Sequence, residues 1–521
     1  MLSENEKRKE RNIREVDGKD LILVIDTGSS SMRGILFDRE GKILATKSRT
    51  YFMRTGPGGV AEQDPEDYRF ALTEICQALA AFCRGKEAKI RALSFTSQRS
   101  SILPLGKDGK PLHSIITWYD KRSVSVCEEF EHAYGEELYE LTGTRLTPVL
   151  SAPKMVWLKR QEPELYKATD KIVGIHDYLL YLCTGKLATD ESLASRTYLM
   201  DIRKRCWSDR LLAIFGLEKE KLCQLLVPGA VVGSVTDSFA ERTGIPAEIP
   251  VITGGGDQQC SILGQGLILG GDIGITVGTG AYVAMVCDHP VFDNAGKRIN
   301  LNAAVVPGKW IAEASTMTSG SAWDWFRKNF YGDSDPTVSI RQINADAGKS
   351  PAGAGGLLAL SSLAGKGCPD WDDYARGGFF GITPSTKKED FARALLEGIA
   401  AEIAECYETL SSLYPGTGRV SVTGGMTKFF VFDQILADMI EISIKKCTIE
   451  ETTAIGAFLT AAAAMGWQES PEAAAVFYGL SDDNAMQTFR PDPSCSAVYR
   501  RFNQARQNLY HSLPTREVST L

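Results

Sequence analysis

Residues 253 to 259 read Thr-Gly-Gly-Gly-Asp-Gln-Gln, and they follow the apolar run Ile249-Pro-Val-Ile252. An apolar run of this kind predicts a buried strand, and the glycines after it predict a tight turn. Asp257 then stands just beyond the carboxyl end of a strand, where open α/β sheets bind their ligands. Asp257 is therefore the first candidate for a functional residue.

A second acid, Asp26, occupies a matching place near the start of the chain. Leu21–Ile25 is a continuous apolar run, residues 26–31 read Asp-Thr-Gly-Ser-Ser-Ser, and Arg33–Phe37 returns as a second run. Two strands joined by a short polar turn predict a β-hairpin. The turn carries one carboxylate and several hydroxyls, which are groups that bind metal ions or phosphates.

The same pattern returns in the second half of the chain, and the two hairpins look like copies of one unit. The later copy consists of the runs Asp272–Val277, Gly278–Gly280 and Tyr282–Val286. Helical periodicity follows each copy, first over Pro65–Arg84 and later near Val431–Lys445. Strands alternating with helices, twice over, predict an α/β fold of two domains with similar topology. We place the boundary in the glycine-rich stretch 262–271.

Length and composition limit the classes of protein. The chain has 521 residues, which is too long for one core, and a net charge of −7. The acidic balance, with no basic run interleaved with aromatics, argues against a nucleic-acid binder. No apolar run reaches the roughly 18 residues that a membrane helix needs. Residues 1–19 are dense in charge without an apolar core, so we expect a flexible tail rather than a signal peptide.

The cysteines and histidines predict no metal or redox centre. The twelve cysteines are scattered, with no C-x-x-C pair, and the five histidines form no metal-binding pattern. Such spacing is typical of reduced, mostly buried thiols in a cytoplasmic protein. His176 stands beside Asp177, and the simplest interpretation is a helix start next to a capping acid.

Two glycine turns are the candidates for phosphate binding, because the chain has neither a P-loop motif nor the protein-kinase motifs. They are Asp26–Ser31 and Gly278–Gly280. Glycine and small hydroxyl side chains let backbone N–H groups point at phosphate oxygens. Arg33 could add a charge-assisted contact. Each turn alone is weak evidence, whereas the same turn at the same place in two repeats is stronger.

With these motifs, the chain resembles the FGGY family of carbohydrate kinases from about Leu21 to about Trp467. Asp26-Thr-Gly-Ser-Ser-x-x-Arg33 resembles the first phosphate loop and Gly255-Gly-Asp-Gln-Gln259 the catalytic-base motif. Further matches are Gly278-Thr-Gly280 as the second phosphate loop, Gly424-Gly425 as the adenosine loop, Gly377-Gly-Phe-Phe-Gly-Ile382, Lys154-x-x-Trp157, and the late helix start Glu451-Thr-Thr-Ala-Ile-Gly456. The residues before Lys154 depart from the family pattern.

The resemblance implies two domains with the ribonuclease-H-like topology of actin, hexokinase and the Hsp70 ATPase, with a cleft between them. Residues 20–265 would bind the sugar and hold the catalytic base, and residues 266–521 would bind the nucleotide. The reaction implied is transfer of the ATP γ-phosphate to a hydroxyl of a small sugar or polyol, which depends mainly on positioning and charge stabilisation. Asp257 would accept the hydroxyl proton. Asp26, acting through water, and Asp257 would organise Mg²⁺. The implied nucleotide-binding residues are Thr27, Gly28, Ser29, Ser30, Arg33, Gly278, Thr279, Gly320, Gly424, Gly425 and Phe429.

The implied sugar contacts are Arg99, Ser100, Trp118, Asp257 and Gln258. Glycerol kinases carry a glutamate where this chain has Ser100, and an aromatic residue where it has Val149. Both differences favour a larger or differently substituted polyol or ketose. Xylulose kinases usually show a Met-His pair near Gln98, and this chain lacks it. Glycerol kinase proper and xylulokinase both stay open as alternatives.

A different functional class also stays open. The same fold serves as a nucleotide-gated binding ATPase in actin-like and chaperone proteins, without sugar phosphorylation. Asp257 and the similarity of residues 96–123 to glycerol kinases argue against that class. For partners we expect a small-molecule sugar or polyol, no nucleic acid and no membrane. The sequence leaves a homodimer or a homotetramer open.

Overall fold

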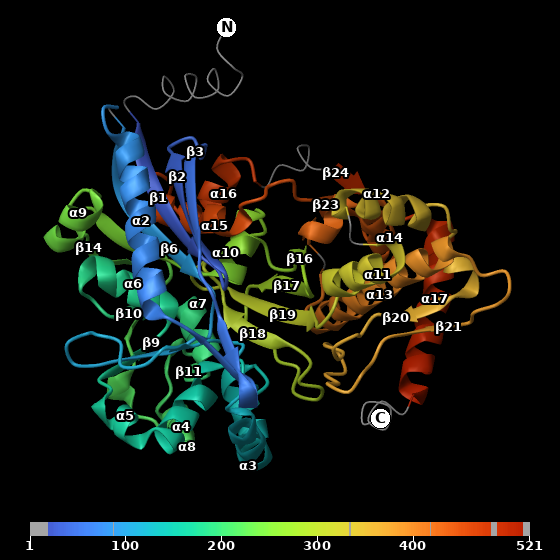
Figure 1. Cartoon of the computed structure of the whole chain (residues 1–521), viewed down its shortest axis with the longest axis horizontal. Helices are drawn as coiled ribbons and strands as arrows, with labels where there is room; N and C mark the ends of the chain where they lie inside the picture. The colour runs from blue at the N-terminus through green and yellow to red at the C-terminus, as the bar shows by residue number, and fades with distance from the viewer. Residues whose placement is uncertain (1–18, 87, 333–334, 417, 481–486, 514–521) are drawn as a thin grey trace, which may run out of the picture. The chain divides into compact units, whose positions relative to one another are not determined.

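The computed structural model describes residues 19–86, 88–332, 335–416, 418–480 and 487–513 (Figure 1). The chain divides into two compact units, each assembled from three stretches of sequence. The first draws on Met1–Ile268, Leu301–Trp310 and Glu451–Ser481, and the second on Leu269–Asn300, Ile311–Glu450 and Asp482–Leu521. The predicted tail, residues 1–19, lies outside the described residues except for Lys19.

The first unit is built on a mixed sheet whose strands run in the order β14-β15-β6-β1-β2-β3. The hairpin predicted at 21–37 is present, and β1 pairs antiparallel with β2 so that Asp26 lies opposite Arg33. Strands β6 and β15 then continue the sheet parallel to β1. The strands are β1 Asp20–Thr27, β2 Ser31–Asp38, β3 Ile43–Thr50, β6 Lys89–Ser97, β14 Val231–Ser234 and β15 Pro250–Gly256.

Helices cover both faces of this sheet. On one face α2 packs on β2 and β3, and α6 and α9 pack beside it; on the other, α15 crosses β1, β6 and β15 and packs on α10 and α16. Leu21, Leu23 and Ile25 of β1 share a buried core with the apolar stripe of α2. The helices are α2 Pro65–Cys83, α6 Ile175–Thr184, α9 Asp237–Thr243, α10 Asp257–Gly264, α15 Thr452–Ala464 and α16 Pro471–Phe477.

A second core of the first unit forms around four further helices, α3 Val124–Thr142, α4 Ser151–Gln161, α5 Pro163–Ala168 and α8 Asp209–Phe215. The remaining short elements are β4 Arg54–Gly56, β5 Val60–Gln63, β7 Leu103–Leu105, β8 Ile115–Ile116, β9 Lys171–Val173, β10 Ala188–Asp190, α7 Glu191–Ala194, β11 Met200–Asp201, β12 Cys206–Trp207, β13 Gln224–Leu226 and β18 Asn300–Ala303.

The second unit repeats the topology with strands in the order β19-β17-β16-β22-β23-β24. Here β16 pairs antiparallel with β17 and parallel with β22, as β1 does with β2 and β6. Its elements are β16 Ile273–Val277, β17 Ala281–Cys287, β19 Trp310–Thr316, α11 Gly320–Tyr331, α12 Pro336–Ala347, β20 Leu358–Leu360, β21 Gly378–Phe380, α13 Lys388–Leu413, β22 Val420–Thr423, α14 Phe430–Ile440, β23 Ile444–Lys446, β24 Gln487–Phe489 and α17 Pro493–Ser512.

One predicted element differs from the structure. The periodicity near Val431–Lys445 predicts a single helix, but α14 ends at Ile440 and the next strand, β23, begins at Ile444. Glu441 adopts a left-handed conformation with φ of 56°, which stops the helix. The following residues pair with β22 and β24, so partners distant in sequence override the local helical pattern.

Candidate active site

Three parallel strands of the first unit bring the predicted acids to one edge of the sheet. Asp26 in β1 lies opposite Thr96 in β6, and Thr96 lies opposite Gly255 in β15. Arg99 follows Thr96 by three residues, and Asp257 follows Gly255 by two. The side chains that carry the proposed chemistry therefore leave the sheet at its carboxyl edge, where α/β sheets bind ligands.

Asp257 is the first residue of α10, and its side chain is 25% exposed. One carboxylate oxygen, Oδ1, accepts a hydrogen bond from the backbone N–H of Gln258 at 2.7 Å. The same oxygen lies 3.5 Å from Nε of Arg99, whose side chain is only 9% exposed. A carboxylate that is oriented by a neighbouring cation and reaches solvent is suited to accept a proton from a bound hydroxyl. Gln258 itself is half-buried.

Asp26 forms a triad with Arg33 and Glu451. Nη2 of Arg33 lies 3.1 Å from Asp26 Oδ2, and Nη1 lies 2.8 Å from Glu451 Oε1. Mainly because of burial, and against the opposing charge of Arg33, the pKa of Asp26 is raised to about 6; the charges of Asp257 and Glu451 contribute to this rise. Several carboxylates thus compete around one guanidinium, an arrangement that an added cation would stabilise.

The loop after Asp26 is held rigidly by side chains from four other segments. Oγ of Ser29 donates to Gln98 Oε1 at 3.1 Å and accepts from the indole N–H of Trp118 at 3.0 Å. Gln63 donates to the Ser29 carbonyl at 2.8 Å, and the hydroxyl of Tyr51 donates to the Gly28 carbonyl at 2.5 Å. Trp118, predicted as a sugar contact, therefore also fixes the predicted first phosphate loop.

The other residues of this loop differ in exposure. Thr27 is fully buried at the end of β1, and its hydroxyl has no hydrogen-bond partner among the described residues. Gly28 is half-buried and Ser30 is exposed. The backbone around the exposed Ser30, rather than the Thr27 side chain, is therefore the part best placed to meet a phosphate.

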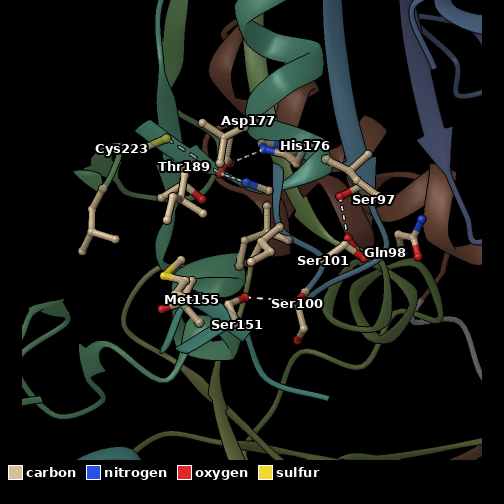
Figure 2. A pocket seen from close by; sticks show the side chains of 18 of the residues that line it. Ser97, Gln98, Ser100, Ser101, Ser151, Met155, His176, Asp177, Thr189 and Cys223 are labelled. Carbon is tan, nitrogen blue, oxygen red and sulfur yellow. Dashed lines mark hydrogen bonds and ion pairs between the residues drawn. The ribbon is translucent and has the colours of Figure 1, made fainter. Parts of the chain in front are cut away.

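Ser100 lines a small cavity of about 40 Å³ in the first unit (Figure 2). Its backbone is left-handed, with φ of 70°, and its hydroxyl donates to the Arg196 carbonyl at 3.3 Å. Figure 2 shows Ser151 joined to Ser100 on one side of the cavity and His176 beside Asp177 on another. This volume is enough for a few water molecules, so the surroundings of Ser100 are not fully packed.

Lys154, from the family signature, is buried and structural. Its ammonium donates to the carbonyls of Val149 at 2.5 Å, Leu150 at 2.9 Å and Ser100 at 3.4 Å. These bonds fix the half-buried Val149 and the Ser100 backbone relative to helix α4. Burial lowers the pKa of Lys154 to about 7, and the charge of Asp120 opposes that shift.

We therefore expect the free energy of unfolding to rise between pH 7 and pH 8.5 through Lys154. The folded-state pKa lies below the value of the unfolded chain, so the unfolded chain holds the proton over this range and raising the pH favours the folded state. The expected rise is about 1–2 kcal/mol. Urea unfolding at several pH values would measure it. Lys154→Met should abolish the rise, whereas Lys159→Met, on the same helix but exposed, should retain it. Equal pH profiles for all three proteins would contradict the assignment.

The second unit brings the remaining predicted nucleotide-binding residues together. The turn Gly278–Gly280 meets the start of α11, where the N–H of Gly320 donates to the Gly278 carbonyl at 2.9 Å and that of Ser319 donates to the Thr279 carbonyl at 2.8 Å. A Cβ on Gly320 would lie 2.4 Å from the Gly278 oxygen, so this approach requires glycine.

The predicted adenosine loop follows the neighbouring strand, β22. Gly424 has φ of 109°, and a Cβ there would lie 2.4 Å from the Val277 oxygen at the end of β16. Gly425, by contrast, has open space on its Cβ side, and Phe429 is half-buried before α14. The structure thus places the two glycine loops of the second unit at the ends of adjacent strands.

Sequence patterns missed several residues that support the site. Glu451 was assigned only as a helix start, yet it holds Arg33. Gln259 contacts Arg99, and the buried Ser192, itself bonded to Asp190, contacts Gly256 and Gln259 on either side of Asp257. The buried His176 is confirmed as a neighbour of a capping acid, since Asp177 accepts from the Gly174 N–H at 2.8 Å.

Two negative findings apply to the described part of the chain. No helix there is long and apolar enough to cross a membrane. No group of three or more His, Cys, Asp or Glu side chains in that part is arranged to hold a metal ion.

Comparisons with known proteins agree with this geometry. Residues 21–264 match the N-terminal domain and residues 273–465 the C-terminal domain of the FGGY family of carbohydrate kinases. The chain is 30% identical to the xylulose kinase of Lactococcus lactis, covering 96% of this chain and 97% of that protein. It is 31% identical to the glycerol kinase of Thermococcus onnurineus, covering 87% and 90%.

A solved structure of the gluconate kinase from Lactobacillus acidophilus superimposes with a TM-score of 0.87 at 26% identity, covering 95% of this chain and 98% of that one. The predicted two-domain α/β fold of the actin, hexokinase and Hsp70 ATPase superfamily is thereby confirmed. Because both halves of the chain match in order and over most of its length, it belongs to the FGGY family of carbohydrate kinases.

Proposed function

We propose that this carbohydrate kinase uses Asp257 as the general base for phosphorylating a hydroxyl of a small sugar or polyol. The observation that carries the proposal is the partly exposed Asp257 carboxylate held beside the Arg99 side chain, which is only 9% exposed. The substrate oxygen attacks the γ-phosphorus of ATP, the bond from that phosphorus to the β,γ-bridging oxygen breaks, and ADP leaves. The hydroxyl proton passes to Asp257. Arg99 keeps the carboxylate oriented.

We infer that the glycine loops hold the ATP phosphates. The N–H groups of Gly28 and Gly278 are used inside their own turns, where they donate to the Ser31 and Gly280 carbonyls at 2.9 Å. The remaining N–H groups of these two turns and of the loop at Gly424–Gly425 stand beside glycines or small side chains, as phosphate-binding turns require. Arg33 is the neighbouring cation of the first loop. The division near residue 265 into a sugar-binding and a nucleotide-binding domain stays a prediction.

The residues present fit Mg²⁺. Asp26 is a buried carboxylate whose pKa is raised by burial and by nearby acids, so a cation beside it would relieve an electrostatic cost. Asp257 is the other proposed carboxylate. Mg²⁺ usually takes one or two protein carboxylates and fills its octahedron with water and phosphate oxygens. When bound, it would neutralise charge on the transferring phosphate.

A panel of sugars tests the proposal. ATP consumption would be measured with each of glycerol, xylulose, gluconate and other polyols, and without any of them. A kinase consumes ATP only when its substrate is present, one ATP for each sugar molecule phosphorylated. The phosphorylated product can then be isolated. Sugar-independent consumption by a folded protein would instead support the nucleotide-gated ATPase. Cytoplasmic location and a homodimer or homotetramer remain further proposals, to be tested by fractionation and by light scattering.

We propose that the substrate is larger than glycerol. Ser100 stands where glycerol kinases carry a glutamate, so the acid that would pair with two small hydroxyls is missing. Ser100 also borders unfilled space. A bound hydroxyl left without a partner in a closed site costs roughly 1–3 kcal/mol. Xylulose and gluconate, the substrates that the names of two similar proteins contain, are the first candidates.

Ser100→Glu should therefore raise kcat/KM for glycerol, relative to the best sugar of the panel, by about 5- to 100-fold. Ser100→Gln is the matched control, because it has the same size without the charge and should give a smaller gain. Steady-state kinetics on the three proteins would measure the effect. Efficient phosphorylation of glycerol by the unmodified protein would overturn the proposal and identify a glycerol kinase with an altered pocket.

A further inference from the structure

A fully buried acid, Asp190, lies at the end of β10 in the first unit. Its Oδ1 accepts from the backbone N–H groups of Ser192 at 2.9 Å and Leu193 at 3.3 Å, and also from the Ser192 hydroxyl. Its Oδ2 accepts from the hydroxyl of Thr253 in β15. Four donors around one buried carboxylate satisfy its charge, so the group is fixed rather than strained.

Ser192 connects this acid to the turn that carries Asp257. Because the Ser192 hydroxyl donates its proton to Asp190, its lone pairs are available to accept, and they accept from the N–H of Gly256 at 3.0 Å. Gly256 directly precedes Asp257. The Ser192 carbonyl also accepts from the Gln259 side chain at 2.9 Å. One buried serine therefore holds the chain on both sides of the proposed base.

The second of these contacts extends to Arg99. Oε1 of Gln259 accepts from Nη1 of Arg99 at 3.3 Å, and Nε of the same guanidinium lies 3.5 Å from Asp257 Oδ1. Gly256 packs tightly beneath them, since a Cβ there would lie 2.6 Å from Gln259 Oε1. The backbone and the cation that orient Asp257 thus both depend on Ser192.

We propose that Asp190 and Ser192 are positioning residues for the base. As the acceptor, the Asp190 carboxylate sets the direction of the Ser192 hydroxyl, and Ser192 then fixes Gly256 and, through Gln259, Arg99. This inference rests on the proposed role of Asp257. Both residues are fully buried, so their loss should slow the chemical step more than it weakens binding.

Ser192→Ala should lower kcat on the order of 10- to 100-fold, as displacements of about 1 Å at a reacting group do. KM for ATP should stay within about twofold, because none of these contacts involves the glycine loops. Ser208→Ala is the matched control. Ser208 is also a buried hydroxyl that accepts a backbone N–H, that of Leu211 at 3.3 Å, but it caps α8 away from the site. The Ser208→Ala variant should lose about as much thermal stability as Ser192→Ala and keep the kcat of the unmodified protein.

A double-mutant cycle with Asp257→Asn distinguishes the proposed role of Asp257 as base from the proposed positioning role of Ser192. If Ser192 acts through Asp257, Ser192→Ala should reduce turnover in the unmodified protein and have little further effect in the Asp257→Asn background. Near-normal turnover in Asp257→Asn alone would overturn the proposed base. Loss of turnover in Asp257→Asn, combined with an unchanged kcat in a folded Ser192→Ala, would overturn only the positioning role. If Ser192→Ala lowered turnover by the same factor in the unmodified protein and in Asp257→Asn, the positioning role would also be overturned.

Ser192→Cys keeps the inference testable if the alanine variant does not fold. The sulfur occupies a similar volume but accepts hydrogen bonds weakly. It should lower kcat in the same direction with KM for ATP unchanged. A folded Ser192→Cys with the kcat of the unmodified protein would contradict the positioning role.

Discussion

Asp257→Asn is expected to lower kcat by roughly 10²- to 10⁴-fold, the contribution usual for a general base. The amide has the size of the carboxylate, and its oxygen can still accept from the Gln258 N–H, so α10 should begin as before. What it cannot do is take the proton of the attacking hydroxyl. ATP binding should persist, because the glycine loops are unchanged. Steady-state turnover together with a nucleotide-binding assay would measure both effects.

Asp209→Asn provides the matched control for this variant. Asp209 is likewise the first residue of a short helix, α8, and it also has a cationic neighbour, with Lys219 Nζ 2.8 Å away. It lies on the surface and away from the sheet edge, so its kcat should be unchanged. Near-normal kcat in Asp257→Asn would contradict the assignment of Asp257 as base.

The fold could be predicted from the sequence because the patterns that decide it are local. The apolar runs on either side of Asp26 and of Gly278 predict the two hairpins, and the structure has them as β1–β2 and β16–β17. The helical periodicity was misleading where a strand pairs with strands that are distant in sequence. Residues 444–446 look helical in sequence, yet they form β23 between strands that lie more than 20 residues before it and more than 40 after it.

The site could be predicted only in part, because many of its supporting contacts join residues that are distant in sequence. Acids after strands mark the sheet edge, so Asp26 and Asp257 could be singled out. The groups that hold them could not. Glu451 contacts Arg33 from 418 residues away, and Ser192 contacts Gly256 from 64 residues away. A buried serine has no periodicity or spacing that reveals its partner, and the bonds of Ser29 to Gln98 and Trp118 have no sequence signal either.

Asp26→Ala is expected to lower activity in a way that depends on Mg²⁺. Asp26 is proposed to hold a metal-bound water, and outer contacts of this kind usually contribute about 10- to 100-fold in metal affinity. The loss should therefore be largest at low Mg²⁺ and be partly restored at high Mg²⁺. Titrating Mg²⁺ at fixed ATP and sugar would show a shifted midpoint.

The alanine variant also removes a partner of Arg33, so the titration needs a control that changes Arg33 alone. Glu451→Gln serves, because it weakens the other ion pair of Arg33, at 2.8 Å, and leaves the Asp26 carboxylate in place. If Asp26 acts through the metal, only Asp26→Ala should shift the Mg²⁺ midpoint, whatever Glu451→Gln does to the maximal rate. If both variants shift it equally, Asp26 acts by orienting Arg33. A loss in Asp26→Ala that is the same at every Mg²⁺ concentration would exclude the metal role.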